Sequence, residues 1–264
     1  MRLAVDHATR YAYESPVRFS TQYLRLTPHD STRQKVLEWK LEAPRRPTRT
    51  LDGYGNVLHV LTLDKPVSEI VIRALGVVET RSGPDEGPDP VPLSPLVFTR
   101  GTALTRADEA LAAFAERHRR RAGSGAGLRD LAAAILRKMP FNPGDTHVSS
   151  SAAEAFATGS GVCQDHAHVF IACCRVLGIP ARYVSGYVYS PGHDGAHISS
   201  HAWAEAWVVD RWLSFDIAND APAGEDHIKI AIGADYSEAC PIRGVRTGGG
   251  RESMSALAQV AQQQ

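Results

Sequence analysis

The chain has 264 residues, 43% of them hydrophobic, which is enough for one large or two modest domains with a buried core. Lys plus Arg and Asp plus Glu number 29 each, so the basic surplus typical of nucleic-acid binding is missing. No stretch approaches the ~20 apolar residues of a membrane-spanning helix, and the N-terminus lacks the apolar segment of a secretory signal. Four cysteines, two of them adjacent, do not resemble a disulfide framework. These features favour a cytoplasmic protein without a nucleic-acid or membrane partner.

The first 80 residues are predicted to form an antiparallel β domain. Residues 36–42 alternate apolar and polar side chains, which is the period of a half-buried strand. A turn cluster at 52–56 precedes a strand-like run at 57–63, and another run begins at residue 70. Several short strands separated by turns are typical of a small sandwich or sheet.

Residues 81–100 are rich in proline, which removes backbone donors and favours extended chain, so they are predicted to be a linker. A second domain is expected over 101–264. Its first part has helical periodicity, with a helix at 128–139 and a capping box formed by Ser151 and Glu154. The rest is predicted to be strands at 182–189, 201–209, 212–217 and 227–232, with the tail from 254 as a last strand or a frayed end. Helices followed by an antiparallel sheet make this domain α+β.

A helix that is apolar on nearly all sides is predicted to begin at Cys163 and to end before a glycine and a proline. Cys163 is therefore expected where a buried helix emerges among polar residues. The positive end of the helix dipole favours a reactive thiolate there, and the Cys163 amide is a candidate oxyanion-hole donor. Free cysteines are commonly just small buried residues, an interpretation that we accept for Cys173 and Cys174.

A β-hairpin is predicted to place a histidine and a carboxylate on one face. Alternation along 200–207 gives His201 a face opposite a row of alanines, and the chain returns through 212–216. By parity, Asp216 shares the face of His201. A carboxylate beside an imidazole fixes its tautomer and supports its charged form, which a Cys–His pair needs from a third member.

The register of this hairpin leaves two carboxylates open. If residues 210–211 form the turn, His201 lies opposite Asp220. If residues 209–210 form it, Asp216 becomes the diagonal neighbour of His201, within reach of its side chain. Spacing alone does not choose between Asp216 and Asp220.

Several of these segments resemble the bacterial transglutaminase-like superfamily. They are Gly161-Val-Cys-Gln-Asp165, Leu177-Gly-Ile-Pro-Ala-Arg-Tyr-Val-Ser-Gly-Tyr187, His201-Ala-Trp203 and Phe215-Asp216. The resemblance implies a papain-related core with a central cysteine helix packed on an antiparallel sheet, and a triad of Cys163, His201 and Asp216. Residues 1–80 are similar, more loosely, to the β-rich N-terminal region often fused to this core. Two departures are His166, where an aromatic residue is usual, and Ile217-Ala218 in place of Pro-Thr.

The resemblance further implies a cysteine-nucleophile enzyme that acts on peptide or isopeptide amide bonds through a thioester acyl-enzyme. The acyl group would pass to water or to an amine. We expect a peptide or protein substrate and no cofactor, and the sequence predicts no oligomeric state. Trp203, Tyr187 and His166 are expected to contribute to the substrate cleft, although aromatic packing within the hairpin is an alternative for its tryptophans.

Two other interpretations remain. Cys163-x-x-His166 together with His197-x-x-x-His201 has the spacing of a Cys/His metal site, although His197 lies in a Gly/Ser-rich stretch and we expect no metal. A catalytically inactive, peptide-binding module on the same fold is the second alternative, since a fold does not guarantee an activity.

Overall fold

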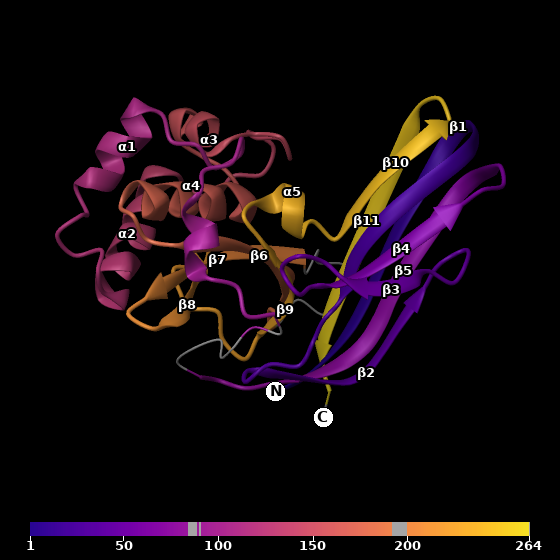
Figure 1. Cartoon of the computed structure of the whole chain (residues 1–264), viewed down its shortest axis with the longest axis horizontal. Helices are drawn as coiled ribbons and strands as arrows, with labels where there is room; N and C mark the ends of the chain where they lie inside the picture. The colour runs from indigo at the N-terminus through magenta and orange to yellow at the C-terminus, as the bar shows by residue number, and fades with distance from the viewer. Residues whose placement is uncertain (84–88, 90, 192–199, 264) are drawn as a thin grey trace.

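The computed structural model describes residues 1–83, 89, 91–191 and 200–263, which form a long β-sheet beside a mixed core (Figure 1). The sheet is built on β1 (Arg2–Thr27), a single strand of 26 residues. Around it lie β2 (Gln34–Glu42), β3 (Thr48–Leu51), β4 (Val57–Leu63) and β5 (Val67–Thr80). Their order is β2-β5-β1-β4-β3, with antiparallel neighbours throughout. The predicted N-terminal antiparallel β region is confirmed.

The end of the chain also belongs to this sheet. Strands β10 (Ile242–Gly248) and β11 (Glu252–Gln262) pair antiparallel with β1. Ser20 of β1 is the partner of both Arg246 and Leu63, so β10 and β11 run along the edge of β1 opposite β4 and β5. The prediction that residues 101–264 form one separate domain is therefore wrong for the tail, whose strands complete the N-terminal sheet. Weak alternation predicts a strand but does not indicate its partner.

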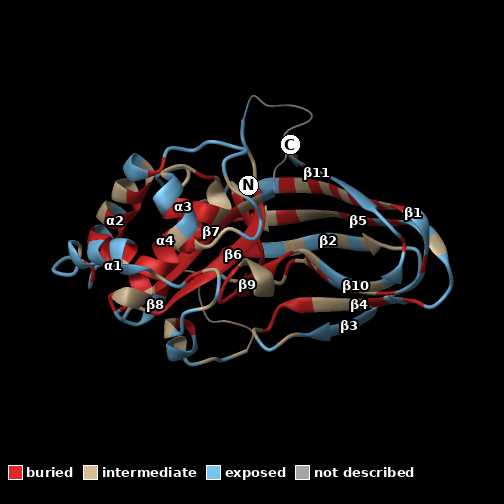
Figure 2. Cartoon of the chain, turned by 90° about the horizontal axis from the view of Figure 1, so that it is seen from above, coloured by how far each residue is buried: buried red, intermediate tan, exposed pale blue. Residues whose placement is uncertain are grey.

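The core contains the helices and a second, four-stranded sheet. The helical elements are η1 (Pro95–Thr99), α1 (Glu109–Glu116), α2 (Gly125–Lys138), α3 (Ala152–Thr158), α4 (Cys163–Val176) and α5 (Tyr236–Ala239). The strands are β6 (Ala181–Val188), β7 (Ser200–Val208), β8 (Arg211–Phe215) and β9 (His227–Gly233), in the order β8-β7-β6-β9. Helix α4 packs on β6 and β7 in the most buried layer of the molecule (Figure 2). The α+β class and the central cysteine helix are therefore confirmed.

Local signals in the sequence explain where several helices begin. Ser151 and Glu154 form the expected capping box of α3, because the Glu154 carboxylate accepts from Ser151 N at 2.8 Å and Ser151 Oγ accepts from Glu154 N at 3.3 Å. Helix α2 begins earlier than predicted, since Ser124 caps it by accepting from Gly127 N at 3.1 Å. No helix in the described part of the chain has both the length and the apolar character that crossing a bilayer demands.

The core is attached to the sheet by an apolar cluster and by the connecting segment. Leu3 and Val5 of β1 pack with Tyr187 and Ile228 of the core, and each such fully buried side chain contributes roughly 1.5–3 kcal/mol. Of the predicted linker, residues 84–88 and 90 lie outside the described residues. Asp89 forms an ion pair with the buried Arg182, so this part of the connection is fixed to the core.

The turn between β7 and β8 contains a backbone conformation that its residue disfavours. Val209 has φ of +61° and is 85% exposed. A β-branched residue in the left-handed region costs about 1–2 kcal/mol, whereas asparagine adopts this region more readily. We therefore expect Val209→Asn to raise the free energy of unfolding by about 0.5–1 kcal/mol in urea denaturation. The control is Val245→Asn on β10, also exposed, which should give no gain. Equal effects of the two changes would contradict the explanation.

Candidate active site

Cys163 is the first residue of α4 and the only partly exposed cysteine, whereas Cys173, Cys174 and Cys240 are buried. Asp165 fixes this end of the helix. Its Oδ2 atom accepts hydrogen bonds from the backbone N of Val162 at 2.9 Å and from Thr146 Oγ1 at 2.6 Å. The thiol therefore lies at the rigid N-terminus of a buried helix, where unpaired backbone N–H groups favour negative charge.

The histidine and the carboxylate come from the adjacent hairpin. Val208 pairs with Arg211, so residues 209–210 form the turn, the second of the two registers considered. His201 of β7 then reaches Asp216, which follows β8, and its Nε2 atom lies 2.8 Å from Asp216 Oδ2. Asp220, the other carboxylate considered, is exposed in the next turn.

The His201 ring links Asp216 to Cys163. Burial disfavours its charged form, but hydrogen bonds to Asp216 and to the Cys163 side chain outweigh burial and raise the pKa of His201 to about 10. Because Asp216 occupies Nε2, Nδ1 is the nitrogen left for the thiol. A folded-state pKa above the unfolded value of about 6.5 means that this interaction stabilises the fold fully below that pH. The stabilisation is lost as the pH rises towards 10.

Asp216 is buried and has two further partners that the sequence did not predict. Its Oδ2 atom accepts from His227 Nε2 at 2.9 Å and from Asn219 Nδ2 at 2.7 Å. Burial alone would raise the pKa of Asp216, but the bonds from His201 and His227 outweigh it and lower that pKa well below its ordinary range. Asn219 lies three residues after Asp216 in a turn, a local signal that was available. His227 begins the next strand, 11 residues after Asp216, and no local pattern pairs the two residues.

The three residues expected in the substrate cleft lie elsewhere. Trp203 is 1% exposed and stacks on His201, with ring centroids 6.3 Å apart. Tyr187 is buried, and its hydroxyl lies 2.7 Å from His7 Nδ1 at the contact with the N-terminal sheet. His166 is fully buried with Nε2 2.7 Å from Met139 O. Trp203 lies on β7, Tyr187 on β6 and His166 on α4, and all three are buried in the packing behind the cleft.

The open cleft lies between the core and the N-terminal sheet and has a volume of about 300 Å³. On the core side, Cys163, His201 and Tyr183 line it. The facing wall comes from the two ends of the chain, with His7, Thr9 and Tyr11 of β1 and Met254 and Ala256 of β11. Figure 1 shows β10 and β11, in yellow, on the side of the sheet that faces α5. Among the described residues that line the cleft there is no lysine, arginine, aspartate or glutamate.

The described residues do not assemble the metal site considered from the sequence. His166 is directed at a backbone carbonyl, and His197 lies outside the described residues. His201, Asp216 and His227 do place three ligand-type atoms within 4.8 Å of one another. Both histidines hydrogen-bond to the Asp216 carboxylate, however, so the three side chains are already satisfied as a hydrogen-bonded group.

A cysteine at the start of a buried helix, facing a histidine and an aspartate from an antiparallel sheet, is the arrangement of the papain-related class. Residues 112–217 match the family model of the transglutaminase-like superfamily, and residues 3–79 match the bacterial transglutaminase-like N-terminal region. The chain therefore belongs to the transglutaminase-like superfamily.

Related chains cover nearly all of this one. An uncharacterized protein of Mycobacterium leprae is 33% identical over an alignment of 281 positions, gaps included, and the alignment covers 98% of each chain. An uncharacterized protein of Mycobacterium tuberculosis is 31% identical over 275 residues, covering 92% of this chain and 87% of its own. A crystal structure of a candidate cysteine protease from Cytophaga hutchinsonii has the same fold, with a TM-score of 0.77 and 21% identity, and covers 99% of this chain and 90% of its own.

The pairing of His201 with Asp216 predicts different effects for the two aspartates. Asp216→Asn replaces a buried anion that accepts two imidazole N–H groups, so we expect acylation of Cys163 by p-nitrophenyl acetate to slow by on the order of 10²–10⁴-fold. Asp220→Asn is the matched control, because asparagine tolerates the left-handed backbone (φ 51°) of that exposed position. A larger loss in Asp220→Asn would show that the wrong carboxylate had been assigned.

Proposed function

We propose that this protein is a cysteine enzyme that cleaves or transfers peptide or isopeptide amide bonds through a thioester acyl-enzyme. The proposal is supported above all by the continuous line of contacts from the Asp216 carboxylate through the His201 ring to the Cys163 side chain. Each member has the chemistry its role requires: a thiol nucleophile, a base that shuttles the proton and an anion that orients the base.

In the proposed reaction the Cys163 thiolate attacks the amide carbonyl carbon. Backbone N–H groups at the start of α4, that of Cys163 included, would stabilise the resulting oxyanion. His201 gives its proton to the departing amine as the carbon–nitrogen bond breaks, which leaves a thioester. Water or a second amine then attacks the thioester, and His201 takes a proton from this nucleophile as the thiolate leaves. Both outcomes use the same three residues.

The lining of the cleft favours an uncharged acyl group as the substrate. Apart from the proposed Cys163–His201 pair, the described residues that line it include no lysine, arginine, aspartate or glutamate, and burial lowers the pKa of His7 on the facing wall to about 4. A charged substrate side chain buried in this cleft would lack an oppositely charged partner, and its desolvation would cost several kcal/mol. A neutral segment such as a glutamine side chain or a backbone amide fits this lining. Incubation with peptide mixtures and mass spectrometry of trapped Cys163 adducts would identify the acyl donor.

The nucleophile–base pair can be tested without knowing the substrate. In the wild type, iodoacetamide should alkylate Cys163 rapidly well below about pH 8.5, where a free thiol ionises. His201→Ala should move the rate profile towards that free-thiol value, because the imidazolium that stabilises the thiolate is gone. Identical profiles for the two proteins would refute the proposal. A wild type with an ordinary thiol profile would instead favour the inactive peptide-binding module.

A further inference from the structure

Behind the three proposed catalytic residues, a second histidine and a second aspartate extend the same line of hydrogen bonds. His227 Nε2 lies 2.9 Å from Asp216 Oδ2, and His227 Nδ1 lies 2.7 Å from Asp226 Oδ1. We propose that His227 is a positioning residue of the site: it holds the Asp216 carboxylate, which in turn fixes the His201 ring, and Asp226 anchors His227. This inference rests on the function proposed above.

The contacts of Asp216 explain why such a residue is needed. His201 and His227 both donate to the same oxygen, Oδ2, at 2.8 and 2.9 Å. Asn219 also contacts this carboxylate, with Nδ2 2.7 Å from Oδ2 and its backbone N 3.3 Å from Oδ1, but Asn219 is exposed in the turn. His227 adds a buried donor from another strand, so the carboxylate must satisfy two imidazole rings at once and its rotation is restricted further. A small misplacement of a catalytic group is costly, since proton transfer depends on near-ideal geometry.

His227 can play this role in either protonation state. When the ring is neutral, Nε2 keeps the proton for Asp216 and Nδ1 accepts from the backbone N of Gly224, 3.1 Å away. When the ring is charged, Nδ1 donates to Asp226 instead. Burial lowers the proton affinity, but bonds to Asp216 and Asp226 outweigh it and raise the pKa of His227. The Nε2–H group that faces Asp216 is present in both cases.

Packing holds the ring as firmly as the hydrogen bonds do. His227 is 7% exposed, and its ring meets Trp203 edge to face at a centroid distance of 5.2 Å. The same tryptophan stacks on His201, whose ring centroid is 5.9 Å from that of His227. The titratable groups that contact His227 in the described structure are thus Asp216, Asp226 and His201. Trp203, expected from the sequence in the substrate cleft, instead packs against both imidazoles.

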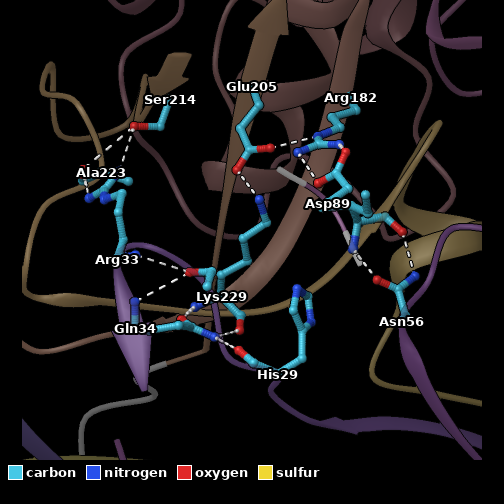
Figure 3. A network of polar contacts seen from close by, with 12 residues as sticks. His29, Arg33, Gln34, Asn56, Asp89, Arg182, Glu205, Ser214, Ala223 and Lys229 are labelled. Carbon is cyan, nitrogen blue, oxygen red and sulfur yellow. Dashed lines mark hydrogen bonds and ion pairs between the residues drawn. The ribbon is translucent and has the colours of Figure 1, made fainter. Parts of the chain in front are cut away.

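The N-terminal region fixes the strand that carries His227. Strand β9 is an edge of the core sheet, and side-chain amides take the place of a further strand along it (Figure 3). Gln34 accepts from Lys229 N and donates to Lys229 O, both at 2.8 Å. Asn56 does the same for Ile232 at 2.8 and 2.7 Å. Through β9 and His227, the N-terminal sheet region therefore contributes to the geometry of the proposed catalytic residues.

The loop before β9 is also held by contacts with the N-terminal region. Thr80 Oγ1 donates to Glu225 O, and the N-terminal ammonium of Met1 lies 3.6 Å from the Glu225 carboxylate. Arg33 donates to Ala223 O, a contact that Figure 3 draws beside Ser214. The backbone on the N-terminal side of His227 is thus tied to residues from the first 80 positions, which leaves the ring little freedom to move away from Asp216.

The test compares the pH profile of Cys163 alkylation by iodoacetamide in the full-length wild type, His227→Phe and His227→Gln. Phenylalanine keeps the ring packing but loses the donor to Asp216, so we expect alkylation at about pH 6.5 to fall roughly tenfold as the profile shifts towards that of a free thiol. Glutamine places an amide N–H near the position of Nε2 and should stay within about threefold of the wild type. His59→Phe, on β4 of the N-terminal sheet, is the control and should leave the profile unchanged.

The outcomes separate this inference from the proposed function. A wild-type profile in folded His227→Phe would overturn the positioning role while leaving the cysteine mechanism intact. Equal shifts in the phenylalanine and glutamine variants would overturn it too, because the hydrogen bond would then not matter. If the wild type itself titrates as an ordinary thiol, the proposed function fails, and the inference fails with it. Should His227→Phe not fold, His227→Leu, a smaller apolar side chain that also lacks the donor, replaces it: a shift towards the free-thiol profile supports the role, and an unchanged profile refutes it.

Discussion

Cys163→Ala should abolish acyl transfer, with a loss on the order of 10³-fold or more, while the protein stays folded. The thiol is the atom that would form the thioester, and no neighbouring group can replace it. Removing a sulfur atom at the partly exposed end of α4 leaves the packing of that helix on β6 and β7 unchanged, so thermal unfolding should move little. The measurement is the burst of p-nitrophenolate released from p-nitrophenyl acetate, together with thermal unfolding followed by circular dichroism.

Cys173→Ala is the matched control for this prediction. Cys173 lies on the same helix, but it is fully buried, and burial raises the pKa of its thiol to about 12. It should therefore remain protonated and unreactive, and its replacement should keep the burst while lowering stability by about 1–2 kcal/mol through lost packing. A burst that survives in Cys163→Ala, or vanishes in Cys173→Ala, would rule out Cys163 as the nucleophile.

Glu205→Gln should lower the free energy of unfolding by about 3–5 kcal/mol, the largest effect on stability that we expect from a single change. Glu205 is fully buried, and its two carboxylate oxygens accept from Arg182 Nε and Lys229 Nζ, each at 2.6 Å (Figure 3). Arg182 also binds Asp89 and lies over the Trp212 ring at 4.0 Å. Neutralising Glu205 leaves the two buried cations with one carboxylate fewer, and their desolvation is then no longer offset.

The same network predicts how stability depends on pH. Burial would raise the pKa of Glu205, but Arg182 and Lys229 outweigh burial and lower it. A folded-state pKa below the unfolded value of about 4.3 contributes stability that is present above that pH and is lost as the pH falls further. Urea denaturation of the wild type and Glu205→Gln should therefore differ most near neutral pH and converge in acid.

Asp6→Asn provides the control for an exposed ion pair. Asp6 and Arg73 form a 2.5 Å salt bridge on the N-terminal sheet, with side chains 39% and 44% exposed. Solvent screens such a pair, so the change should cost at most about 1 kcal/mol. A Glu205→Gln variant that is no less stable than Asp6→Asn would show that the buried network adds nothing to the fold.

The sequence by itself determined the local structure and the kinds of residue in the site. The capping box at Ser151, the helix that begins at Cys163 and the strands of the hairpin were all predictable, because each depends on residues close together in the chain. Parity along the hairpin placed Asp216 on the face of His201, and the register with its turn at residues 209–210 brings the two side chains together.

Only the tertiary structure decided which surfaces meet. Alternation marks one face of a strand as apolar but does not say what covers it, and Trp203 proved to be packed beneath His201 instead of lining the cleft. Strand β11 finds its partner in β1, which lies more than 200 residues away at its closest pairing. That pairing supplies one wall of the cleft, while the edge contacts to β9 place His227 against Asp216. Such contacts join distant segments, and the free energy that selects them comes from burial and hydrogen bonding that no short stretch of sequence contains.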